Sequence, residues 1–164
     1  GRLTAAKNYP LLLRAFQTLL QSRDANLLIL GEGEERAKLQ GLIHDLGIED
    51  HVLLPGYVEN PWAYMSKADL FVLSSKWEGL PTVLVEALAL GIRVVSTDCE
   101  YGPRELLEDG RYGLLVPVDD VDHLAAGMLK ALDSDPPGVR LSDLEEFRLD
   151  TAVKRYRTLL LNGS

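Results

Sequence analysis

Short runs of β-type residues alternate with helical patterns along most of the chain. Strand-like apolar runs lie at 26–30, 52–54, 70–73, 93–96 and 113–116. Helix-like segments lie at 9–21, 34–46, 62–67, 81–90, 103–107 and 121–132. Strands that alternate with helices through short connections predict βαβ units on a parallel sheet. One α/β domain over residues 1–164 is therefore expected.

The two ends of the chain depart from this alternation. Residues 1–8 precede the first predicted helix without a strand, so we expect that the first strand of the sheet is absent and that the natural protein is longer. Residues 133–144 are rich in Asp, Ser, Pro and Gly and predict a loop. A last amphipathic helix is predicted at about 149–161, within a C-terminal crossover segment at 147–161.

Two glutamates bracket the start of an apolar helix. Glu86 is the only acidic residue in the run 81–91, where an unpaired buried carboxylate would cost several kcal/mol, so a ligand or partner is expected. Glu78 lies eight positions upstream, in the loop 78–81. Gly79 allows close approach to the backbone, and Pro81 is predicted to be the first helical residue. A helix N-terminus of this kind suits a phosphate group.

Glycines also mark the carboxyl ends of the predicted strands, where open α/β sheets bind ligands. The turn Gly31-Glu32-Gly33 is similar to the start of a dinucleotide fingerprint, but residue 36 is Arg and the third glycine is absent. A tight turn explains this pattern better.

Composition narrows the class of protein. The 164 residues are 46% hydrophobic, enough for one core without disulfides. Cys99 is the only cysteine, which fits a reducing cytoplasm, and with no His nearby it is not expected to be a nucleophile. The net charge of −8 disfavours nucleic acid as a partner. No apolar run approaches the roughly 20 residues of a membrane span.

No metal or cofactor site is expected. Asp119, Asp120 and Asp122 mimic an Asp-x-Asp metal motif, but they precede a predicted helix, where an N-cap and early negative charge are favourable. The three histidines have no companions at metal-ligand spacing. Trp62 and Trp77 are interpreted as packing residues, although Trp77 adjoins the loop 78–81 and could line it.

Taken in order, these segments resemble the C-terminal nucleotide-binding domain of the retaining glycosyltransferases of family 4, also called glycosyl transferases group 1. The resemblance rests on GRL with Lys7 and Asn8, LLILGEGEER, VLLPGYVEN, ADLFVLSSKWEGLPTVLVEALALGIRVVSTD, GPRELLEDGRYGLLV and FRLDTAVKRYRTLL. It implies a Rossmann-like three-layer domain with a parallel sheet, the C-terminal half of a GT-B glycosyltransferase. A separate N-terminal domain would supply the acceptor site, and the fragment alone would be inactive.

The resemblance also implies roles for individual residues. Arg2 and Lys7 would hold the diphosphate of a nucleotide sugar, where fixed cations stabilise the departing group. Glu86 would accept hydrogen bonds from the ribose diol. Glu78 would lie beside the donor sugar. The remaining expected substrate contacts come from the loop, the helix start and the segment after strand 52–54: Gly79, Leu80, Pro81, Thr82, Val83, Tyr57 and Val58.

The implied activity is retaining, metal-independent transfer of a hexose or N-acetylhexosamine from a UDP-sugar to a glycan or lipid-linked acceptor. Retention is expected by front-face attack, so Glu78 is not assigned as a nucleophile. The setting would be polysaccharide or lipopolysaccharide biosynthesis in the cytoplasm or at its membrane face. Two alternatives stay open: a non-catalytic nucleotide-binding module, and another GT-B enzyme such as a nucleotide-sugar epimerase or a phosphorylase. Turnover of UDP-sugar without acceptor would indicate the epimerase.

Overall fold

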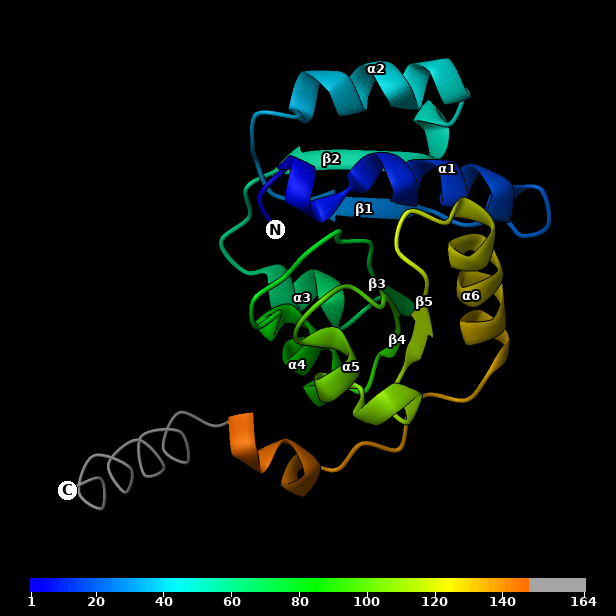
Figure 1. Ribbon diagram of the computed structural model, residues 1–164. Coiled ribbons are helices and arrows are strands. Elements are labelled where there is room, and N and C mark those ends of the chain that lie inside the picture. Colours follow the sequence, from blue (N-terminus) through cyan, green and yellow to red (C-terminus); the bar gives the residue numbers. More distant parts are fainter. Residues whose placement is uncertain (148–164) are drawn as a thin grey trace.

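The computed structural model describes residues 1–147 (Figure 1). Within this range the strands are β1 (Leu27–Leu30), β2 (Val52–Gly56), β3 (Leu70–Leu73), β4 (Arg93–Thr97) and β5 (Leu114–Val116). The α-helices are α1 (Tyr9–Leu20), α2 (Arg36–Leu46), α3 (Pro61–Met65), α4 (Thr82–Ala89), α5 (Pro103–Leu106) and α6 (Val121–Asp133). Short 3-10 turns are η1 (Ala5–Lys7), η2 (Glu49–His51), η3 (Glu108–Gly110) and η4 (Leu141–Phe147).

Every strand and helix predicted within residues 1–147 is confirmed, with ends that differ by at most two residues. The predicted loop 133–144 is shorter than expected, because η4 begins at Leu141. The Asp143 carboxylate accepts the backbone N–H of Arg140 at 3.0 Å and so fixes this turn. The helix predicted at 149–161 lies outside the described residues. No helix among the described residues is long and apolar enough to cross a membrane.

The strands are parallel, but they form two sheets instead of one. β1 pairs with β2, and β3, β4 and β5 form a second sheet with β4 in the middle. No strand of the described residues joins β1 to β3, so the predicted parallel strands are confirmed and lie in two sheets.

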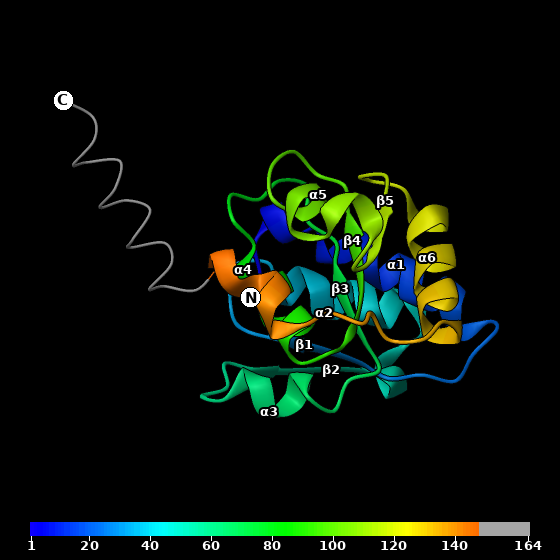
Figure 2. The same ribbon diagram turned by 90° about the horizontal axis from the view of Figure 1, so that it is seen from below.

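Two hydrophobic clusters cover opposite faces of the β3–β5 sheet. Val95 belongs to the cluster beneath α1 and α6, whereas its neighbour Val94 belongs to the cluster beneath α4 and α5. Successive residues of a strand point to opposite faces, so β4 is shared by both clusters. Figures 1 and 2 show α1 and α6 side by side on one face and α4 and α5 together on the other. This is the three-layer arrangement that the resemblance implied.

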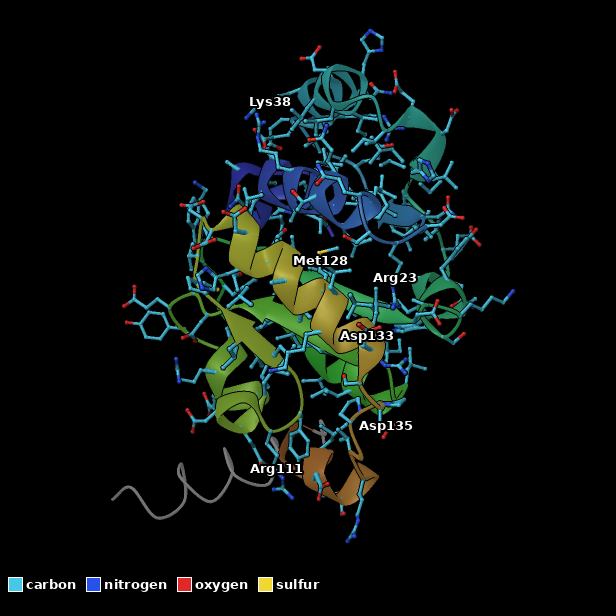
Figure 3. The ribbon with its side chains drawn as sticks, turned by 90° about the vertical axis from the view of Figure 1, so that its right-hand side faces the viewer. Arg23, Lys38, Arg111, Met128, Asp133 and Asp135 are labelled. Atoms are coloured by element: carbon cyan, nitrogen blue, oxygen red, sulfur yellow. The ribbon has the colours of Figure 1, made fainter. Side chains whose placement is uncertain are left out.

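The cluster between α1 and α6 is closed at its rim by a salt bridge. Met128 of α6 is buried in this cluster, and an ion pair joins Arg23, just after α1, to Asp133 at the end of α6 (Figure 3). Both partners are partly exposed, so the pair contributes little to stability.

The Gly31-Glu32-Gly33 turn packs directly against the first residues of the chain. A Cβ atom at Gly33 would lie 2.3 Å from the carbonyl oxygen of Leu3, and Leu3 is fully buried. The Leu3 N–H donates to the Glu32 carbonyl at 2.8 Å, and Glu35 N–H donates to the Leu3 carbonyl at 3.1 Å. These glycines therefore serve close backbone approach, in agreement with the tight-turn interpretation.

Candidate active site

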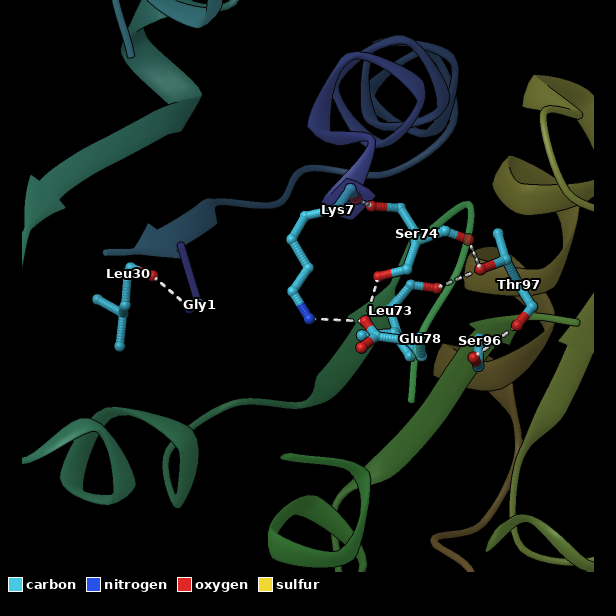
Figure 4. A network of polar contacts seen from close by, with 9 residues as sticks. Gly1, Lys7, Leu30, Leu73, Ser74, Glu78, Ser96 and Thr97 are labelled. Atoms are coloured by element: carbon cyan, nitrogen blue, oxygen red, sulfur yellow. Dashed lines mark hydrogen bonds and ion pairs between the residues drawn. The ribbon is translucent and has the colours of Figure 1, made fainter. Parts of the chain in front are cut away.

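The loop after β3 brings Glu78 back toward η1. Glu78 Oε1 accepts a hydrogen bond from Lys7 Nζ at 2.6 Å and a second from Ser75 Oγ at 2.6 Å (Figure 4). The Glu78 side chain is 10% exposed and that of Lys7 is 26% exposed. Glu78 is thus a fixed, largely buried carboxylate. Its second oxygen, Oε2, has no hydrogen-bond partner among residues 1–147 and is available to accept from a hydroxyl group.

Backbone and side-chain hydrogen bonds hold η1 against this loop. Ser74 Oγ donates to the Lys7 carbonyl at 2.8 Å, and Lys76 N–H donates to the Ala6 carbonyl at 2.8 Å. Asn8 has a left-handed backbone (φ 49°) that ends η1 and begins α1. Ala6 and Asn8, which flank Lys7 in the chain, are both fixed, so the position of the Lys7 backbone is fixed as well.

Asp119 ties a third segment to the same place. Its carboxylate accepts from Asn8 Nδ2 at 2.8 Å and forms a 3.0 Å ion pair with Lys76. The next residue, Asp120, caps α6 by accepting the His123 N–H at 2.9 Å. The acidic run therefore acts as a helix cap and a brace for Asn8. Among residues 1–147, no group of three or more His, Cys, Asp or Glu side chains is placed to hold a metal ion.

The base of the loop is fixed by hydroxyl groups at the ends of two strands. Thr97 Oγ1, fully buried at the end of β4, donates to the Ser75 carbonyl at 2.6 Å (Figure 4). Ser74 and Ser75 are also buried, directly after β3. Sequence reasoning missed these residues, and it assigned Asp119 only to the start of a helix. The available signal was polar residues that directly follow apolar strands, at the edge where ligands bind.

The negative charge of Glu78 reaches two neighbouring groups. Burial, assisted by Glu78, raises the pKa of Tyr9 to about 12. Burial, again with a contribution from Glu78, raises the pKa of the Cys99 thiol. A buried thiol with a raised pKa is a poor nucleophile, in agreement with the expectation from sequence.

Glu86 lies one to two turns into α4 and has a protein partner. Its Oε2 accepts a hydrogen bond from the indole N–H of Trp62 at 2.9 Å. Trp62 is 52% exposed and Trp77 is 57% exposed, so the interpretation of both as packing residues is wrong. The physical reason for Trp62 is that α3 is a five-residue surface helix with no buried residue.

The start of α4 differs from the prediction by one residue. Pro81 is the N-cap, with φ −77° and ψ 77°, and Thr82 is the first helical residue. A ψ of this size lies outside the helical region, so the chain turns at Pro81 before the helix begins. Gly102, in the loop after β4, packs on this turn, since a Cβ atom there would lie 2.4 Å from Pro81 Cδ.

The other predicted site residues are less constrained. Arg2 is exposed and its guanidinium has no hydrogen-bond or ion-pair partner among residues 1–147. Tyr57 and Leu80 are 77% and 61% exposed, and Val83 is half-buried against the cluster beneath α4. Gly79 is exposed and Val58 is half-buried. These residues present groups to the surface and do not pair with one another.

A hollow of about 880 Å³ opens beside the turn at Pro81. Residues of the segment 98–109 line it, among them Glu100, Tyr101 and Glu105. None of the predicted site residues lines this hollow.

A family model described as "Glycosyl transferases group 1" matches residues 1–145. The chain belongs to this family. The N-acetylgalactosamine-N,N'-diacetylbacillosaminyl-diphospho-undecaprenol 4-α-N-acetylgalactosaminyltransferase of Campylobacter jejuni is 43% identical over 135 residues. A lipopolysaccharide core biosynthesis glycosyltransferase of Rhizobium meliloti, LpsE, is 33% identical over 143 residues. The matches cover 82% and 87% of this chain, but 36% and 41% of those relatives.

Solved structures of glycosyltransferases share the fold of this group 1 chain. A variant of TarM from S. aureus, in complex with fondaparinux, α-GlcNAc-glycerol and UDP, superposes with a TM-score of 0.89 and 25% identity. The superposition covers 97% of this chain and 34% of TarM. The α/β fold and its kinship to GT-B glycosyltransferases, expected from the sequence, are thus confirmed.

Proposed function

We propose that this group 1 chain is the donor-binding half of a retaining glycosyltransferase. The reaction would transfer a hexose or N-acetylhexosamine from a UDP-sugar to a glycan or lipid-linked acceptor, in surface polysaccharide or lipopolysaccharide assembly. The observation that carries the proposal is the meeting of Lys7 with Glu78 at the carboxyl edge of the β3–β5 sheet, with Glu86 on the helix that follows. UDP in the TarM complex and the lipid-linked and lipopolysaccharide names of relatives support it.

In this proposal each charged side chain binds a different part of the nucleotide-sugar donor. Lys7, assisted by Arg2, holds the diphosphate, whose negative charge increases as the bond to the sugar breaks. An ammonium group has three donors, so Lys7 can keep its bond to Glu78 while it binds phosphate. Glu78 directs Oε2 toward a sugar hydroxyl, and Glu86 accepts from the ribose diol. Tyr57 and Val58, after β2, face the base.

The arrangement of Glu78 suits binding better than nucleophilic attack. Its Oε1 already accepts two hydrogen bonds, which stabilise the negative charge and lower its nucleophilicity. The proposal therefore assigns retention to front-face attack, in which the leaving phosphate takes the proton of the acceptor hydroxyl. No bound metal ion is part of it.

Calorimetric titration with UDP, GDP and ADP in buffer containing EDTA tests the proposal. We expect metal-independent binding of UDP, weakened by about 1–3 kcal/mol in Glu86→Ala, because the ribose hydroxyls lose their acceptor. Asp45→Ala is the matched control, since Asp45 is an exposed acid on α2. Absence of nucleotide binding, or equal losses in the two variants, would contradict the proposed site.

A further inference from the structure

The indole of Trp62 binds one of the two carboxylate oxygens of Glu86. Trp62 lies on α3, whose first turn is fixed because Asn60 Oδ1 accepts the Ala63 N–H at 3.2 Å. Its Nε1 donates to Glu86 Oε2 at 2.9 Å. Glu86 Oε1 has no hydrogen-bond partner among residues 1–147, so one oxygen is held and the other is available.

This contact is not explained by packing. Trp62 is 52% exposed and belongs to neither hydrophobic cluster, although a tryptophan with a purely structural role buries most of its ring. An indole N–H can donate a hydrogen bond but cannot accept one. It can therefore bind the Glu86 carboxylate without accepting hydrogen bonds from the ribose hydroxyls in its place. Its one polar group is therefore suited to hold Glu86 without replacing its ligand.

We propose that Trp62 is a positioning residue for Glu86, an inference that rests on the proposed binding of ribose. A free glutamate side chain populates several rotamers, and a ligand that needs one of them must select it. The bond to Trp62 restricts the carboxylate before the nucleotide binds and leaves Oε1 for the ribose diol. The indole thereby increases affinity through preorganisation, without contact with the nucleotide.

Titration of the wild-type protein, Trp62→Phe and Tyr64→Phe with UDP tests this inference. Trp62→Phe keeps an aromatic ring at an exposed site and removes the N–H. Tyr64→Phe is the matched control, because Tyr64 is an exposed aromatic residue of the same helix whose hydroxyl has no partner among residues 1–147. We expect UDP binding about three- to tenfold weaker for Trp62→Phe and unchanged for the control. Melting temperatures verify that each variant is folded.

A second ligand separates positioning from a general structural role. With 2′,3′-dideoxy-UDP, which lacks the ribose diol, the wild type and Trp62→Phe should bind equally. In a Glu86→Ala background, Trp62→Phe should likewise have no further effect on UDP binding, because the two side chains act as a unit. Both results are expected only if the indole acts through Glu86.

Three results would overturn the inference. These are an equal loss with both ligands, an unchanged affinity for UDP, and tighter binding of UDP by Trp62→Phe, which would mean that the indole blocks the carboxylate. If the wild-type protein bound no UDP, the proposed function would fail, and this inference with it. If UDP bound and Glu86→Ala weakened it while Trp62→Phe did not, only the inference would fail.

Discussion

Lys7 Nζ and Glu78 Oε1 lie 2.6 Å apart, although 71 positions separate the two residues in the chain. The pair joins η1, which leads into α1, to the loop between β3 and α4. A phosphate that contacts Lys7 would therefore lie next to the carboxylate that is proposed to contact the sugar. In the proposed complex, the ion pair would set the spacing between these two parts of the donor.

Removal of one partner of this pair is expected to destabilise the fold. In Lys7→Met the largely buried Glu78 would keep only its bond from Ser75, at a cost of about 1–3 kcal/mol in the free energy of unfolding. Solvent limits this cost, because the Lys7 side chain is 26% exposed.

Denaturant unfolding of the wild type and these three variants checks this expectation. The double variant Lys7→Met/Glu78→Gln should recover part of the loss, because no unpaired charge is left behind. Lys130→Met, at an exposed lysine of α6, should stay within about 0.5 kcal/mol of the wild type. Equal destabilisation by Lys7→Met and Lys130→Met would show that the pair has no role in stability.

The raised pKa of Tyr9 predicts a loss of stability in alkaline solution. Its pKa rises from about 10 in the unfolded chain to about 12 in the fold, through burial and the charge of Glu78. Below pH ~10 both states hold the proton, so the contribution is fully present. Between pH ~10 and ~12 the unfolded state releases the proton first, and stability falls as the pH rises.

Urea unfolding of the wild type and Tyr9→Phe at pH 9, 10 and 11 measures this contribution. The difference in unfolding free energy between the two proteins should change by about 1.3 kcal/mol from pH 9 to pH 11, mostly above pH 10. Because Glu78 helps to raise the pKa of Tyr9, Glu78→Gln should lower that pKa in an ultraviolet titration of the phenol. Parallel stability curves for wild type and Tyr9→Phe would refute the shift.

Gly102 supports the turn at Pro81, so Gly102→Ala should damage the site as well as the fold. The new Cβ atom would lie 2.4 Å from Pro81 Cδ and 2.8 Å from the Gly79 carbonyl oxygen, and the loop would have to move. UDP-sugar binding should weaken at least tenfold, since a shift of about 1 Å in a positioned group is costly.

Gly110→Ala is the control for backbone strain. Gly110 has a φ of +97°, close to the +91° of Gly102, but no atom lies within 4 Å of its Cβ position. Both variants should lose about 1 kcal/mol of stability or more, and only Gly102→Ala should lose UDP-sugar affinity. Calorimetric titration of both variants decides this, and equal affinities would contradict the support by Gly102.

Much of the fold follows from local patterns in the sequence. Apolar strand runs such as 70–73 and amphipathic helices such as 121–132 are set by neighbouring residues, so their positions could be predicted. The division of the strands into two sheets could not be predicted, because local patterns do not determine which distant strands pair. The position of Pro81 as N-cap also depends on its backbone angle, which its neighbours in space influence.

The site was predictable only as a set of residue types. Glu78 and Glu86 stand out because acids are unusual beside apolar elements, and the family resemblance added Lys7 and Arg2. Their contacts did not follow from the sequence: the bond from Lys7 to Glu78 and the brace from Asp119 to Asn8 each span distant segments. Trp62 was assigned to packing because large aromatic rings are usually buried. Nothing local shows that α3 lies on the surface.

The hydrogen bonds between η1 and the loop after β3 cross the boundary between the two hydrophobic clusters. The turn at Ala6 and Lys7 leads into α1 on one side, whereas Ser74 and Lys76 lead toward α4 on the other. A nucleotide that engages Lys7 and Glu86 together would bind only when both clusters are assembled. Such a nucleotide would link the two clusters, and its binding energy would increase the cooperativity with which they unfold.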